Sequence, residues 1–214
     1  MKEFNDSLRE LIIKNNSFEV EKLLEQQVKK FPRDIDLWLK LCMTRINTPI
    51  EDGEKALECI EVIYQLNNEN FYAHILEYEV FNVIFGFVED EHYNKLANLR
   101  TNHKEQLSII KYLTAFYWYF TKRNISRTIE VLQESIRLND KYVNNYNFLG
   151  DIYLENGNKE DGLQLKRKAV SNIQFVYPSN YIHDCTDINE YISEFITGIH
   201  VSKGRDKEIL EGWK

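Results

Sequence analysis

The chain has 214 residues, of which 43% are apolar and 13% aromatic, so it is long enough to bury a sizeable core. Its net charge of −7 argues against nucleic acid as a partner and favours basic proteins or peptides. The sequence contains neither a stretch of 18 apolar residues nor the hydrophobic run of a signal peptide near its start; this excludes membrane-spanning helices and predicts a cytoplasmic protein.

Only 8 glycines and 3 prolines occur, a composition that suits helices better than turn-rich β-structure. Two helix-turn-helix units are expected in the first third of the chain. Their apolar positions are Phe4, Leu8 and Leu11, then Val20 and Leu24 before Pro32, and in the second unit Trp38, Leu41 and Cys42, then Ala56 and Ile60. The proline in Thr48-Pro49 predicts a break between the two helices of the second unit.

A third unit begins near Phe71, but its second helix, roughly residues 89–100, does not fit the pattern. The fourth and fifth units, residues 109–142 and 143–176, fit best. Tyr112-x2-Ala115-Phe116-x2-Tyr119 recurs 34 residues later as Tyr146-x2-Leu149-Gly150-x2-Tyr153. The segment Asn156-Gly157-Asn158 predicts the turn inside the fifth unit, with the glycine in a left-handed conformation.

This pattern resembles the tetratricopeptide repeat (TPR), a helix-turn-helix unit in which small residues allow close helix contact and aromatic residues fill the gaps between neighbours. The resemblance implies an all-α fold, an α-solenoid of about five TPR-like repeats. We expect the array over residues 1–176, with a divergent third repeat at about 71–108. Residues 177–214 depart from the repeat and are expected to form a C-terminal cap packed on the array.

The sequence offers little for catalysis. It lacks the glycine-rich loops that bind phosphate, the HExxH zinc motif and the GxSxG nucleophile motif. Cys42, Cys59 and Cys185 show no CxxC spacing and are expected to be reduced. We therefore expect no enzyme activity, no cofactor and no metal. A metal-dependent enzyme remains an alternative, which rests on the cluster from His183 to Asp187 alone.

Apart from Tyr117 and Phe120, the aromatic run from Phe116 to Phe120 is expected to pack in the core, because five adjacent residues point all the way round a helix. In proteins that the chain resembles, ligands lie in the groove lined by the first helix of each unit. Transferring those positions by register predicts a partner-binding set: Tyr72, Glu79, Asn82, Tyr117, Phe120, Asn144, Asn147, Asp151 and Glu155.

In this set the carboxylates of Glu79, Asp151 and Glu155 are expected to steer a basic partner, and Tyr72, Tyr117 and Phe120 to be buried as anchors. The paired Lys, Arg and Asn residues with which some TPR proteins bind a carboxylate are missing from the groove positions. The resemblance therefore implies a protein-binding module for a basic or polar protein partner.

The abundance of Asn, Lys and Ile is typical of an AT-rich bacterial genome. Small acidic bacterial proteins without catalytic residues often resemble immunity proteins, so the most specific hypothesis is an inhibitor that neutralises a basic toxin. The alternative is an assembly adaptor or secretion chaperone that binds an extended peptide in the same groove. The sequence does not decide the oligomeric state.

Overall fold

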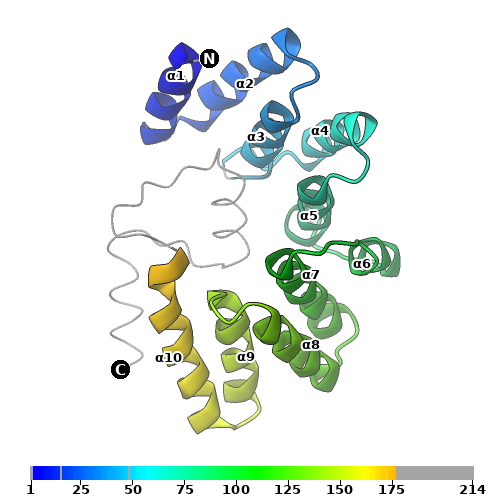
Figure 1. The fold of residues 1–214 in the computed structure, drawn as a ribbon, viewed down its shortest axis with the longest axis vertical. Coiled ribbons are helices and arrows are strands. Elements are labelled where there is room, and N and C mark those ends of the chain that lie inside the picture. The colour runs from blue at the N-terminus through cyan, green and yellow to red at the C-terminus, as the bar shows by residue number, and fades with distance from the viewer. Residues whose placement is uncertain (1, 15, 48, 177–214) are drawn as a thin grey trace. The chain divides into compact units, whose positions relative to one another are not determined.

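The computed structural model describes residues 2–14, 16–47 and 49–176 (Figure 1). The described residues form two compact units that meet in the sequence between Leu96 and Ala97, called here unit 1 and unit 2. This boundary falls inside the divergent third repeat. The predicted cap, residues 177–214, and with it the cluster from His183 to Asp187, lies outside the described residues.

Helices account for the regular structure throughout the described ranges, in agreement with the predicted all-α fold. They follow one another as five pairs, and the first helices of the third and fourth pairs each end in a π-helical turn (η). The elements are α1 (Lys2–Ile13), α2 (Ser17–Lys30), α3 (Ile35–Ile46), α4 (Gly53–Leu66), α5 (Phe71–Glu79), η1 (Val80–Ile84), α6 (Asp90–Ala97), α7 (Lys104–Phe116), η2 (Tyr117–Thr121), α8 (Ile125–Leu138), α9 (Val143–Glu155) and α10 (Lys159–Val176).

Short polar side chains fix where several of these helices begin. In unit 1 the side-chain oxygens of Asn16, Asp34, Asp52 and Asn70 accept hydrogen bonds from backbone N–H groups in the first turns of α2, α3, α4 and α5. Each bond satisfies a donor that has no partner inside its helix. The predicted break at Thr48-Pro49 agrees with the end of α3 at Ile46 and the start of α4 at Gly53.

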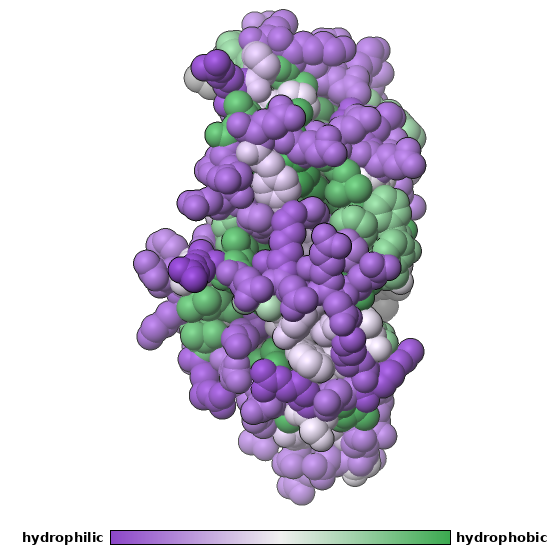
Figure 2. All heavy atoms as spheres, turned by 90° about the vertical axis from the view of Figure 1, so that its right-hand side faces the viewer, coloured by the Kyte–Doolittle hydropathy of each residue, from purple (hydrophilic) through white to green (hydrophobic). Residues whose placement is uncertain are grey.

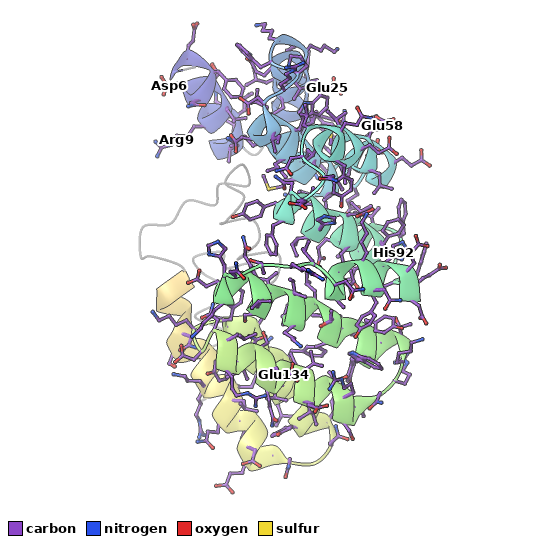
Figure 3. All side chains as sticks on the ribbon, turned by 45° about the vertical axis from the view of Figure 1, so that its right-hand side comes forward. Asp6, Arg9, Glu25, Glu58, His92 and Glu134 are labelled. Atoms are coloured by element: carbon purple, nitrogen blue, oxygen red, sulfur yellow. The ribbon has the colours of Figure 1, made fainter. Side chains whose placement is uncertain are left out.

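A buried arginine joins three helices of unit 1. Arg45 on α3 is 6% exposed, and its guanidinium donates to Glu21 at 3.1 Å and to Glu25 at 2.8 Å, both on α2. It also donates to the carbonyl oxygen of Lys55 at 3.0 Å and to the sulfur of Cys59 at 3.2 Å, both on α4. Figure 3 labels Glu25 on its helix. Cys42 and Cys59 are both free and buried.

Two glycines bring α9 and α10 of unit 2 into close contact. A Cβ atom added to Gly150 would lie 3.1 Å from the carbonyl oxygen of Gly162, and one added to Gly162 would lie 2.7 Å from Cγ of Leu154. The expectation that small residues at these positions allow close approach is confirmed. Gly157, in the predicted turn between the two helices, has φ of 83° and so adopts the left-handed conformation.

Charge is divided unevenly between the two units. Residues 1–96 carry 19 acidic and 11 basic side chains, whereas residues 97–176 carry 8 acidic and 12 basic ones. The acidic character of the whole chain therefore does not describe unit 2, whose described residues are net basic. A partner chosen by charge would meet a different surface on each unit.

Candidate functional site

The most exposed aromatic surface of unit 2 lies where η2 and α9 come together. Phe116 stacks on Phe148 with ring centroids 4.7 Å apart, and Phe120 stacks on Phe116 at 5.7 Å. The rings of Phe120 and Phe148 are nearly parallel, 9° apart. Phe120 is 51% exposed, while the other two rings are half-buried. We call Phe116, Phe120 and Phe148 the aromatic platform.

One polar contact borders the platform. The ring of Tyr119 meets Phe148 edge-on at 5.3 Å, and its hydroxyl donates to Oε2 of Glu155 at 2.5 Å. This hydrogen bond raises the pKa of Tyr119 above its usual value. The exposed carboxylate of Glu155 is thereby held beside the rings, where it can accept a further hydrogen bond from a ligand.

The π-helical turn η2 places Phe120 at the end of its helix. The backbone N–H of Lys122 donates to the carbonyl oxygen of Tyr117 at 3.0 Å, five residues earlier, and Arg123 then reverses the chain with φ of 53°. A left-handed backbone at an arginine stores strain, and such strain is common at functional sites. Single π-helical turns inside α-helices are also frequent at functional sites.

The polar residues of α9 are engaged by a lysine from the other helix of the pair. Lys166 on α10 is 4% exposed, and its ammonium group donates to Oδ1 of Asn147 at 2.6 Å and pairs with Asp151. Its stem passes Gly150, where an added Cβ would lie 3.2 Å from Cγ of Lys166. Burial lowers the pKa of Lys166, and Asp151 offsets part of that effect.

The contacts of Lys166 change the role that was predicted for the polar residues of α9. Asp151 and Asn147 were predicted to contact a basic partner, but they already bind a cation from their own chain. Because the register argument considered only first helices, it missed a lysine that reaches past a glycine from the second helix. Glu155 is the predicted acid of unit 2 that remains exposed beside the platform.

Two further predicted residues of unit 2 are buried. Tyr117 is 3% exposed and Asn144 is 1% exposed, so neither side chain is available to anchor a partner. The amide nitrogen of Asn144 donates to the hydroxyl of Tyr112 at 3.3 Å. Phe120 alone among the predicted aromatic residues of unit 2 has a largely exposed ring.

The remaining predicted residues, Tyr72, Glu79 and Asn82, belong to unit 1. Tyr72 and Asn82 are half-buried, and Glu79 is 2% exposed. Burial raises the pKa of Glu79 to about 8, and a hydrogen bond from Asn82 offsets part of that effect. A buried carboxyl group that stays protonated near neutral pH cannot steer a basic partner, so the steering role expected for Glu79 is wrong.

The described residues include one arrangement that could suggest acid–base chemistry, between α4 and α5. The hydroxyl of Tyr64 donates to Oε2 of Glu77 at 2.6 Å and lies 3.0 Å from Nδ1 of His74. Burial raises the pKa of Tyr64 and lowers that of His74, and Lys95 of α6 closes the network by pairing with Glu77 at 2.5 Å. These groups satisfy one another, and the cluster joins three helices.

No family model matches the sequence, and a search of curated proteins finds no significant match. The fold is similar to solved structures of MamA. The chain "MamA 41-end from Desulfovibrio magneticus RS-1" matches with a TM-score of 0.59 and 13% identity, over 81% of this chain and 95% of that one. The chain "MamA RS-1 ArsTM double mutant" matches with a TM-score of 0.58 and 13% identity, over 83% and 97%.

These likenesses confirm the TPR-like solenoid class that the 34-residue period predicted. At such low identity they concern the fold alone. None of the described helices combines the length and apolar character needed to cross a membrane. Among the described residues, no group of three His, Cys, Asp or Glu side chains is placed to hold a metal ion.

Proposed function

We propose that this chain is a non-enzymatic protein-binding module and that the aromatic platform of unit 2 is one of its contact surfaces. The observation that supports this most strongly is the exposed ring of Phe120, 51% accessible, stacked on two other phenylalanines beside the Glu155 carboxylate. A few buried residues, aromatic ones prominent among them, supply most of the binding energy in protein interfaces.

The geometry of the platform favours a particular kind of partner side chain. A flat group that stacks on the ring of Phe120 and also donates a hydrogen bond to Glu155 would use both features. The guanidinium of an arginine does so, since it stacks on aromatic faces and binds carboxylates through paired donors. The proposal therefore keeps the predicted basic partner and narrows its contacts to Phe120 and Glu155.

The narrower role that we propose is inhibition of a basic toxin domain, as in immunity proteins. The exposed carboxylate of Glu155 beside the platform supports it, because a carboxylate at the contact surface attracts a basic domain. An adaptor that binds an extended peptide is the second candidate, and the small size of the three-ring platform favours it. A bacterial source and a cytoplasmic location stay predictions.

Affinity capture with the full chain tests the proposal. The chain is immobilised, partners are identified from a lysate of its own cells, and the purified partner is titrated calorimetrically. Phe120→Ala should weaken binding by about tenfold or more, the effect of removing an aromatic anchor. The matched control is Phe18→Ala on α2, whose ring is also exposed, at 62%.

Equal affinities of the wild-type, Phe120→Ala and Phe18→Ala chains would refute the platform as a contact surface. The stoichiometry separates the two narrower roles. One folded domain bound tightly per chain supports the inhibitor, whereas micromolar binding of a linear peptide supports the adaptor. Glu155→Gln should reduce the affinity for an arginine-containing partner more than for its lysine-substituted form.

A further inference from the structure

A group of exposed apolar side chains, two of them aromatic, lies in unit 1, where η1 ends and the chain turns towards α6. Val83 is 51% exposed, Phe85 is 37% exposed and Phe87 is 49% exposed. We call these three residues the η1 patch. Figure 2 shows that hydrophobic residues form islands within an otherwise hydrophilic face. Contiguous exposed apolar groups of this kind mark interaction sites more often than single exposed residues do.

The rings of the patch rest on a packed aromatic base. Phe81 lies 5.5 Å from Phe85 and 6.0 Å from Phe87, measured between ring centroids. The imidazole of His92, which Figure 3 labels, stacks on Phe81 at 3.8 Å and meets Phe87 edge-on at 6.4 Å. The Nδ1 atom of His92 accepts a hydrogen bond from the backbone N–H of Glu89 at 3.1 Å, which fixes the position of the ring.

The backbone also holds the patch in place. The N–H of Phe85 donates to the carbonyl oxygen of Val80 at 3.1 Å, and the N–H of Phe87 donates to that of Phe81 at 3.0 Å. A Cβ added to Gly53, at the start of α4, would lie 2.9 Å from Cγ2 of Ile84 and 3.0 Å from the ring of Phe85. The exposed rings are thus presented by a packed turn whose geometry is set before any ligand arrives.

Exposed carboxylates belong to two segments that adjoin the patch. Because Gly53 contacts Phe85, the exposed side chains of Glu51 and Glu54 lie at the helix start that borders the ring. Exposed Glu89 and Glu91 follow Phe87 along the chain, at the start of α6. The nearby Lys55 is paired with Asp52 at 2.9 Å, so it does not offset these four carboxylates.

We propose that the η1 patch is a docking surface for a basic amphipathic segment of a protein partner, with aliphatic or aromatic residues that cover Phe85 and Phe87 and lysines or arginines that face the flanking carboxylates. Charge complementarity carries this choice, since the patch is bordered by acids and unit 1 has 19 acidic and 11 basic side chains. The surface is distinct from the aromatic platform and does not depend on it. It gives the module a second point of attachment.

A peptide selection tests the proposal with the full chain. A phage library of random peptides of about 15 residues, the length of a short amphipathic helix, is panned against the wild-type protein. We expect the enriched peptides to combine apolar residues with several lysines or arginines and to bind with micromolar affinity, as befits a small surface. Phe85→Ser combined with Phe87→Ser should weaken that binding at least tenfold.

Three matched variants make the result specific. Phe31→Ser alters a more exposed ring on another part of unit 1, at 55%, and should leave peptide binding unchanged. Phe120→Ala, which tests the aromatic platform, should also leave it unchanged. Combined Glu54→Lys and Glu89→Lys should weaken binding and reduce its dependence on salt. If the double serine variant fails to fold, Val83→Lys replaces it, because the side chain of Val83 is 51% exposed and a cation there would repel a basic segment.

Four results would overturn the proposal. The first is that no basic peptides are enriched, and the second is that the enriched peptides bind the double serine variant as tightly as the wild type. The third is that their binding is lost in Phe120→Ala, which would assign them to the aromatic platform. The fourth is a concentration-dependent dimer in sedimentation equilibrium that disappears in the double serine variant, because a second copy of the chain would then cover the patch.

Discussion

Replacing Arg45 with methionine removes a cation that ties α2, α3 and α4 together. The side chain of Arg45 is 7% exposed, whereas those of Glu21 and Glu25 are 15% and 38% exposed. Loss of one partner from a buried ion pair costs about 3–5 kcal/mol, because the other charge is left without compensation. Glu25 can regain water and Glu21 can do so only partly, which places the expected loss at about 3 kcal/mol.

The assay is native-state hydrogen exchange of the α3 backbone amides, because denaturation of a chain with two compact units need not be two-state. Arg45→Met should lower the opening free energy of α3 by about 3 kcal/mol. Combining Arg45→Met with Glu21→Met should recover at least half of the loss, since an apolar pair replaces a buried charge without a partner.

Glu58→Gln on α4 is the control, because Glu58 is exposed on the same helix as two of the acceptors of Arg45, and it should change the opening free energy by less than about 0.5 kcal/mol. The reasoning fails if Arg45→Met costs less than about 1 kcal/mol, which would mean that both glutamates rehydrate freely. It also fails if the double methionine variant is no more stable than Arg45→Met alone.

Two further predictions concern single residues. The pKa of Glu79 is raised to about 8 in the folded protein, so the native state keeps a proton that the unfolded chain releases, and the free energy of unfolding should fall as the pH rises from about 5 to about 8. Glu79→Gln should remove this part of the pH dependence when the opening free energy of α5 is measured by hydrogen exchange, and an unchanged slope between the two pH values would contradict the burial argument. Gly157 has φ of 83° with open space around its Cβ position, so Gly157→Ala should destabilise unit 2 by about 1 kcal/mol and Gly157→Asn by less, as measured by exchange of the α9 amides. A stability gain for Gly157→Ala would show that the turn can leave the left-handed region.

The repeat period predicted the parts of the fold that depend on side-chain size and spacing. It placed Gly150 at a small position of the repeat, where helices approach closely, and Gly157 in a left-handed turn, and the structure has both features. It also singled out Tyr117 and Phe120 from a run of five aromatic residues; the ring of Phe120 is 51% exposed, whereas Tyr117 is 3% exposed. Such features follow from positions within one repeat, which a sequence pattern records directly.

The candidate site was predicted less well, because exposure and charge depend on contacts between helices. A register transfer treats Glu79 as a groove residue, but neighbouring helices leave it 2% exposed. It also overlooks Lys166, whose long stem brings a cation past Gly150 to Asn147 and Asp151. The hydrophobic period does not distinguish π-helical from α-helical turns, so neither η1 nor η2 could be predicted.

Both proposed surfaces lie at the same structural feature. In each, the first helix of a pair ends in a π-helical turn, which is followed by a residue in the left-handed conformation. The turns begin 37 residues apart, at Val80 and Tyr117, and the reversing residues are Gly86 with φ of 72° and Arg123 with φ of 53°. In each case the widened turn presents phenylalanine rings at the end of the helix. Their surroundings differ, since carboxylates flank the η1 patch.

This difference assigns separate physical roles to the two surfaces. At the platform, Lys166 already neutralises Asp151, so stacking and a single carboxylate, Glu155, remain for recognition. Binding there should depend mainly on buried ring area and only weakly on salt. At the η1 patch, several carboxylates act together in the acidic unit, so attraction of a basic segment should extend further and weaken as salt is added. The acidic character from which a basic partner was first inferred therefore supports the η1 patch more directly than the groove positions of unit 2.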